Sequence, residues 1–126
     1  MIEELVKKIT SAEKKISEEK GDFAFFGLSE RGDLENQWDV IVSAVWFSGD
    51  TQKDLVYIIE KIKQSIADDD LRLLARVVLL NPSTDFIVKK LNELINTEHE
   101  PIEKENIQVN GTMFKRLWVI TSKVGA

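Results

Sequence analysis

The chain has 126 residues, of which 43% are hydrophobic and 31% charged, and 17 Lys+Arg against 22 Asp+Glu give it a formal charge of -5. It is too apolar for a disordered chain, and the absence of cysteine excludes disulfides, thiol catalysis and zinc–thiolate sites. No apolar run approaches the ~20 residues of a membrane span, and no signal-peptide pattern opens the chain. We expect one acidic, cytoplasmic domain over residues 1–126, with no membrane contact and no nucleic acid as its main partner.

The first segment predicts an amphipathic helix over residues 2–20. Its apolar residues recur at intervals of three and four and form one stripe. The stripe consists of Ile2, Leu5, Ile9, Ala12 and Ile16. Gly21 ends the helix, because glycine commonly follows a helix C-terminus.

Two strands and a second helix follow. FAFFGL (23–28) and WDVIVSAVWF (38–47) are rich in aromatic and β-branched residues and predict antiparallel strands joined by a polar loop. Residues 51–67 then keep helical spacing. Thr51 and Asp54 resemble a capping box, which makes Thr51 the predicted N-cap.

The run LRLLARVVLL (71–80) is almost continuously apolar, which is typical of a strand buried on both faces. Asn81-Pro82-Ser83 ends it, and a third helix is predicted to begin at Pro82 or Ser83. Residues 97–105 are predicted to form a polar loop. Asn110-Gly111 then indicates a tight hairpin turn between two final strands.

These elements predict an α/β fold, a mixed five-stranded sheet with three helices in the order α-β-β-α-β-α-β-β. The passages 38–80 and 71–110 each run from strand through helix to strand, so both are predicted to be parallel crossovers. The pattern leaves the strand order open.

Three helices are too few to cover both faces of five strands, because one helix covers about two strands. Some apolar sheet surface is therefore expected to stay open and to form an interface, in the simplest case a homodimer. Trp38, Trp46 and Trp118 are the predicted interface anchors, since aromatic residues are enriched at interface centres. A folded-over loop or a different partner protein remains an alternative.

The stretch FFGLSERGDLENQWDVIV (25–42) resembles the nucleotidyltransferase signature, in which Gly-Ser ends one strand and Asp-x-Asp opens the next. The resemblance implies two carboxylates that hold Mg²⁺ against nucleotide phosphates. The sequence departs from this pattern where Leu28 follows Gly27 and where Gln37 stands in place of the first aspartate, and strand 71–80 has no carboxylate. We therefore expect Asp39 to bind no metal on its own, and we predict no catalytic residue and no cofactor.

FGLSER (26–31) with WDVIVSAVW (38–46) is also similar to a pattern of small, uncharacterised prokaryotic proteins, a resemblance that implies no activity. Asp68-Asp69-Asp70 offers carboxylates to a cation, but a solvated connection is the favoured interpretation. His99, between two glutamates, is interpreted as solvent-exposed, because no nucleophile pairs with it in the sequence.

Strand alternation places polar residues on one predicted sheet face. Asp39, Ser43, Arg76 and Arg116 form a candidate patch there. We favour a structural ion pair within it, because buried charges need partners. An anion- or partner-binding site is the alternative.

Three classes of function follow from these patterns. We favour a non-catalytic interaction or assembly domain, because packing and oligomer signals occur without a complete catalytic set. A nucleotidyltransferase-like enzyme, or its inactive descendant, is the second hypothesis. A small-anion sensor that uses Arg76 and Arg116 is the third.

Overall fold

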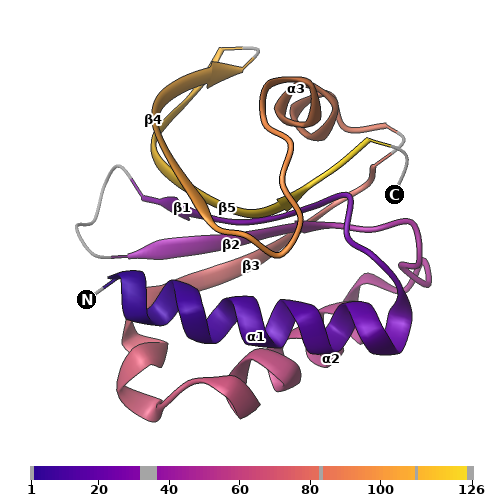
Figure 1. The fold of residues 1–126 in the computed structure, drawn as a ribbon. Coiled ribbons are helices and arrows are strands. Elements are labelled where there is room, and N and C mark those ends of the chain that lie inside the picture. The colour runs from indigo at the N-terminus through magenta and orange to yellow at the C-terminus, as the bar shows by residue number, and fades with distance from the viewer. Residues whose placement is uncertain (1, 32–36, 83, 110, 125–126) are drawn as a thin grey trace.

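The computed structural model describes residues 2–31, 37–82, 84–109 and 111–124. Its elements are α1 (Ile2–Lys20), β1 (Phe25–Glu30), β2 (Trp38–Ser43), α2 (Thr51–Ser65), a short 3₁₀ helix (Asp68–Leu73), β3 (Leu74–Leu80), α3 (Phe86–Leu94), β4 (Ile102–Val109) and β5 (Thr112–Ser122). The strands form one mixed sheet in the order β3-β2-β1-β5-β4 (Figure 1). The predicted α/β class, element order and five-stranded mixed sheet are confirmed, and the 3₁₀ helix is an addition.

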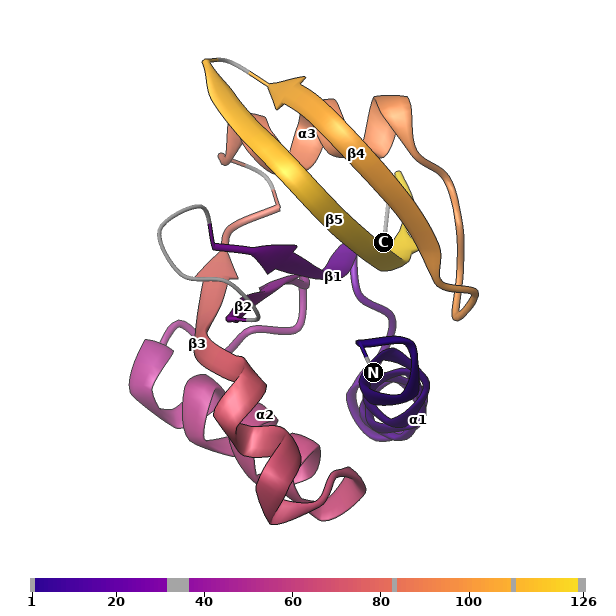
Figure 2. The same ribbon diagram turned by 90° about the vertical axis from the view of Figure 1, so that its left-hand side faces the viewer.

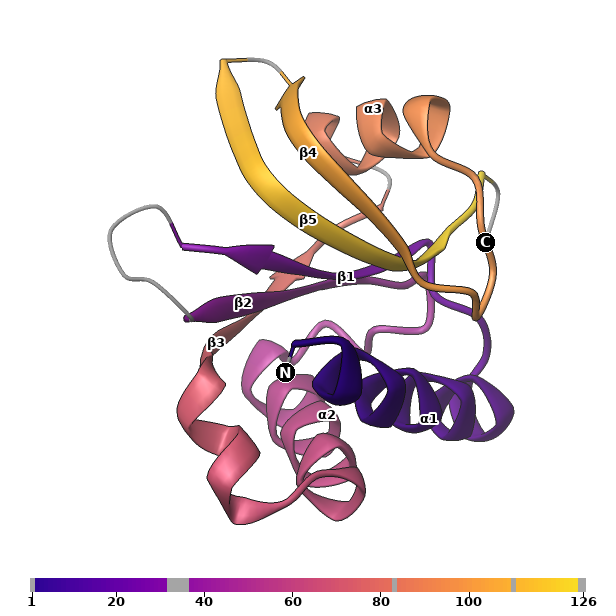
Figure 3. The same cartoon turned by 60° about the vertical axis from the view of Figure 1, so that its left-hand side comes forward.

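The helices divide between the two faces of the sheet. Helices α1 and α2 lie against one face, and α3 lies on the other, inside the curve of β4 and β5 (Figure 1, Figure 3). The buried side chains accordingly form two clusters, one beneath α1 and α2 and one beneath α3. Side chains along β1 alternate between the two clusters, since Phe26 packs in the first cluster and Phe25 in the second.

Helix α1 buries a wider face than its apolar stripe predicts. Val6, Thr10 and Glu13 are buried beside the stripe residues. At its other end, Glu19 joins α1 to α2, since Tyr57 Oη donates to Glu19 Oε1 over 2.6 Å and Lys61 Nζ donates to Oε2 over 2.7 Å. Partial burial, followed by the bond to Glu19, raises the pKa of Tyr57 to about 12.

One of the two predicted parallel crossovers is present. Strand β3 runs parallel to β2, with α2 between them in the chain. The second crossover is wrong, because β4 lies at the far edge of the sheet from β3 and runs antiparallel to it. The reason is that β4 is positioned by its hairpin with β5, while α3 carries the chain across the whole sheet.

Local side-chain bonds shift several element boundaries. Asp50 is the N-cap of α2, accepting from the Lys53 backbone N–H over 3.1 Å, so the predicted Thr51 cap is wrong. Asp54 instead accepts from both the backbone N–H and the hydroxyl of Ser48, over 2.9 and 3.0 Å. Asp85 caps α3 in the same way.

Other boundaries also differ from the prediction. Strand β2 ends at Ser43, and β4 begins at Ile102, inside the predicted loop. Ser83 and Asn110 lie outside the described residues, whereas Gly111 has the positive φ, 81°, that the predicted turn requires. Among the described residues, no helix is both long enough and apolar enough to span a membrane.

Gly27 is needed where β1 pairs with β5. A Cβ added there would lie 2.8 Å from the Trp118 carbonyl oxygen and 3.0 Å from a ring carbon of Phe25. The strands also shift register between Phe26 and Gly27. The glycine of the nucleotidyltransferase-like stretch therefore has a packing role in this fold.

Gly27→Ala should lower the free energy of unfolding by about 1–3 kcal/mol, because the added methyl group would clash with the Trp118 carbonyl oxygen of the neighbouring strand β5. Urea denaturation followed by circular dichroism measures this. Ser29→Ala in the same strand is the control, since it adds no atom. Equal stability of Gly27→Ala and wild type would contradict the packing role.

Candidate functional site at the β3 edge of the sheet

Strand β3 lies at an edge of the sheet, although its sequence is that of an inner strand. Six of its seven residues are apolar, and none of the seven is buried. In β2, the strand with which β3 pairs, five of six residues are buried. The prediction that this run is buried on both faces is wrong for the single chain, because no strand of the described residues pairs with the outer side of β3.

The opposite edge, β4, differs in character. It carries the exposed charged residues Glu103, Lys104 and Glu105, and Asn106 adopts a positive φ of 53°. Charged side chains and backbone irregularities are the usual protection of an edge strand against pairing with another chain. β3 has one charged residue, Arg76, and no positive φ. Of the two edges, only β4 is protected.

Hollows adjoin β3 on both sides. On the α2 side, Ile59, Ile62, Leu71 and Ala75 contribute to a hollow of about 160 Å³. On the α3 side, a hollow of about 360 Å³ is lined in part by Val78, Leu80, Ile87 and Met113. Apolar side chains at this edge therefore extend beyond the strand itself, and on the α3 side they lie beside the charged residues Arg31, Asp39 and Arg76.

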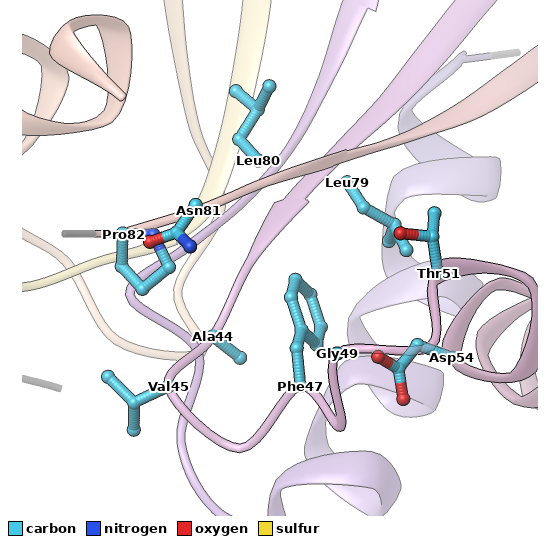
Figure 4. Close-up of a pocket in the computed structure, with 10 residues that line it drawn as sticks. All are labelled: Ala44, Val45, Phe47, Gly49, Thr51, Asp54, Leu79, Leu80, Asn81 and Pro82. Carbon is cyan, nitrogen blue, oxygen red and sulfur yellow. The ribbon is translucent and has the colours of Figure 1, made fainter. Parts of the chain in front are cut away.

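A third hollow, of about 400 Å³, lies where β2 and β3 end and α2 begins. Asn81 and Pro82 lie on one side of it and Thr51 and Asp54 on the other (Figure 4). Both carboxylate oxygens of Asp54 already accept hydrogen bonds from Ser48. The Asp54 carboxylate therefore holds the loop that precedes α2.

Asp39 and Arg76 form an ion pair at the β3 edge. Arg76 Nε lies 3.2 Å from Asp39 Oδ2, and Arg31 Nη1 lies 3.6 Å from Oδ1. The Asp39 side chain is 14% exposed and that of Arg76 64%. Two guanidinium groups therefore face one largely buried carboxylate, in agreement with the favoured interpretation as an ion pair.

Arg31 was not among the predicted site residues. In the β1–β2 hairpin, Ser29 pairs with Asp39, so Arg31 lies on the diagonal from Asp39. The sequence signal for this contact is the position of Arg31 at the end of FGLSER (26–31), just after the first predicted hairpin strand. The contact between Arg31 and Asp39 depends on the register of the β1–β2 pairing, which the sequence leaves open.

Ser43 belongs to the same strand face as Asp39 but not to the ion pair. It lies four residues further along β2, roughly 13 Å away at strand spacing. The side chain is fully buried, and its hydroxyl finds no hydrogen-bond partner in the described part of the chain.

Arg116 lies on the opposite face of the sheet, so its predicted place in the patch is wrong. Leu117 of β5 packs in the cluster beneath α3, and alternation therefore turns Arg116 to the α1 side. There its Nη2 lies 2.8 Å from Glu103 Oε2, and its guanidinium carbon lies 5.2 Å from the Trp38 ring centroid. The hydrogen bond to Glu103 raises the pKa of Arg116.

The three tryptophans also lie on the face covered by α1 and α2. Trp38 is 2% exposed inside that core, so it has no surface to offer a partner. Trp46 and Trp118 are partly buried against the same core. Trp46 makes edge contacts with Phe23 and Tyr57, at 5.5 and 6.2 Å between ring centroids. The predicted anchors therefore serve mainly to pack the helices.

Two further sequence interpretations change. Asp70 accepts from Lys8 Nζ over 3.0 Å, which lowers the pKa of Asp70, so the aspartate run is partly engaged in the fold. His99 is not simply solvent-exposed, because its Nδ1 lies 2.6 Å from the buried carboxylate of Glu13.

The chain matches no protein-family model, no curated protein and no solved structure. Both resemblances drawn from the sequence therefore stay predictions.

We predict that the protein transfers no nucleotide in the presence of Mg²⁺, because two guanidinium groups compete for the Asp39 carboxylate. The test incubates the protein with Mg²⁺ and labelled ATP and measures label on protein or RNA. Incorporation that disappears in Asp39→Ala would contradict the prediction.

Proposed function

We propose that this protein is a non-catalytic assembly domain that forms a homodimer through β3. The supporting observation is that an apolar strand with an inner-strand pattern lies at an edge with no residue buried. Antiparallel pairing with β3 of a second copy makes both strands inner strands of one ten-stranded sheet. The outer backbone N–H and C=O groups of β3 then gain hydrogen-bond partners.

A second copy suits this edge because β3, which is mostly apolar, can pair antiparallel with an identical strand. Closed two-fold dimers are the commonest soluble assemblies, and antiparallel pairing of identical strands has that symmetry. The only charge on β3, Arg76, is already paired with Asp39 within the chain. Pairing therefore brings no unpartnered charge into the interface.

The register of this pairing follows from Arg76. With Val77 opposite Val77 of the partner subunit, all seven residues are paired, and Arg76 faces Val78 of the partner subunit. A shift that sets Arg76 against its own copy would place like charges directly opposite each other, which is destabilising. We therefore place the two-fold axis at Val77.

The hollows beside β3 support an interface larger than one strand. Stable interfaces bury on the order of 800 Å² per partner, more than a seven-residue edge supplies alone. The apolar side chains Leu71 and Met113 lie in the hollows on either side of the strand, and Met113 is 56% exposed. Covering them adds apolar area to the backbone pairing.

The other two functions have less support. A metal-dependent nucleotidyltransferase requires a free carboxylate group, whereas Asp39 faces Arg76 and Arg31. An anion sensor built on Arg76 and Arg116 requires both on one face, whereas they lie on opposite faces and each is paired with a carboxylate. A cytoplasmic location remains a prediction.

Light scattering coupled to gel filtration at micromolar concentration should give about twice the 14.4 kDa chain mass for the wild type. Ala75→Lys should shift the protein to the monomer mass, because lysine on an edge strand opposes pairing. Ala75 is exposed, so the chain should still fold, which circular dichroism checks.

Gln108→Lys is the matched control, since it places the same charge at an exposed position of the β4 edge. It should remain dimeric. A monomeric wild type, or a dimer that survives Ala75→Lys and dissociates with Gln108→Lys, would overturn the proposal.

Cysteine cross-linking tests the register, because the chain has no cysteine of its own. Val77→Cys should form an intermolecular disulfide on mild oxidation, since residues directly opposite in antiparallel strands lie within disulfide range. Ala75→Cys should not, because Leu79 of the partner subunit faces it. Non-reducing electrophoresis measures both, and cross-linking at 75 alone would contradict the register.

A further inference from the structure

A second group of chemistry-bearing side chains lies far from β3 in the sheet order. Asp22 follows α1, Glu98 and His99 lie between α3 and β4, and Lys123 follows β5. One ligand atom each from Asp22, Glu98 and His99 lies within 4.8 Å of the others. Two carboxylates and an imidazole from two separate segments thus converge at one place.

The imidazole of His99 is held by a buried carboxylate. Glu13 of α1 has no exposed surface, and its Oε1 lies 2.6 Å from His99 Nδ1. Its Oε2 accepts from the hydroxyls of Thr121 and Ser17, over 3.0 and 3.2 Å. Thr121 Oγ1 also accepts from the His99 backbone N–H over 3.1 Å.

These hydrogen bonds engage one ring nitrogen of His99, Nδ1. A carboxylate accepts hydrogen bonds, so we infer the tautomer in which His99 Nδ1 donates its proton to Glu13 Oε1. Nε2 is then the nitrogen left to bind a ligand. A carboxylate behind a histidine in this way is the usual outer support of a metal-binding imidazole, because it fixes the tautomer and the ring orientation.

Lys123 is the cation that now faces the two carboxylates. Its Nζ lies 2.9 Å from Asp22 Oδ2 and also bonds Glu98 Oε2. These two ion pairs place the Lys123 ammonium between the two carboxylates. The Lys123 side chain is partly exposed, and two carboxylates facing one cation leave a net negative charge.

We propose that Asp22, Glu98 and the Nε2 of His99 bind a divalent transition-metal ion of the Zn²⁺ class, which displaces Lys123. An imidazole with two carboxylates suits zinc, whereas Mg²⁺ prefers oxygen ligands and keeps its waters. Three protein ligands leave a position for water. Glu13 is a positioning residue, since it reaches the ion only through His99.

Calorimetric titration of Zn²⁺ into chelator-treated protein should show saturable binding of one ion per chain. The decisive variant is Lys123→Met, which removes the competing ammonium and should tighten Zn²⁺ binding about tenfold. Lys115→Met, an exposed lysine in β5, is the matched control and should leave the affinity unchanged.

His99→Gln should weaken Zn²⁺ binding at least tenfold, and Glu13→Gln about 10- to 100-fold. Mg²⁺ should not compete at equal concentration. No saturable Zn²⁺ binding, or unchanged affinity in both Lys123→Met and His99→Gln, would overturn the proposal. The dimer test is run without metal, so its result and this one are independent.

Discussion

The parallel pairing of β2 with β3 is the interaction on which the rest of the structure depends. It requires α2 as a crossover, and α2 with α1 then covers one face of the sheet. Among the helices of the described residues, α3 alone remains for the other face (Figure 2). The same pairing makes β3 an edge, since the three remaining strands all add on the other side of β2. An apolar strand without a second neighbour is the consequence.

The paired charges of the fold serve different purposes at the two ends of the sheet. Near β3, Asp39 forms ion pairs with Arg76 and Arg31, which supply counter-charges to its largely buried carboxylate. Beyond β5, Glu13 is wholly buried and contacts His99 Nδ1, and a nitrogen of the same imidazole lies near the carboxylates of Asp22 and Glu98. Glu13 is tolerated because both of its oxygens have hydrogen-bond partners. Asp39 Oδ1 has no hydrogen-bond partner in the described residues, and Asp39 is stabilised by its ion pairs with Arg31 and Arg76. The ion pairs leave the Asp39 carboxylate no free position for a metal ion, whereas the Glu13–His99 contact belongs to the proposed metal site.

The nucleotidyltransferase-like stretch has a structural account in this fold. Gly27 allows β1 to approach the Trp118 carbonyl, and Asp39 pairs with arginine on the neighbouring strand. Both residues are therefore required by packing and charge, whatever the origin of the motif. A short motif can have this spacing for reasons of strand geometry alone.

The sequence by itself determined the type and order of the elements, because hydrophobic periodicity and turn residues act over a few positions. It also brought Asp39 and Arg76 together, since parallel neighbours were expected on either side of α2. Only the tertiary structure decided the strand order, and with it that the apolar run 74–80 lies at an edge and that Arg116 faces α1. The contact between Glu13 and His99, which lie 86 positions apart, likewise could not be predicted from the sequence. The one local sign was a glutamate beside the apolar stripe of α1, and its partner depends on how loops far apart in the chain meet.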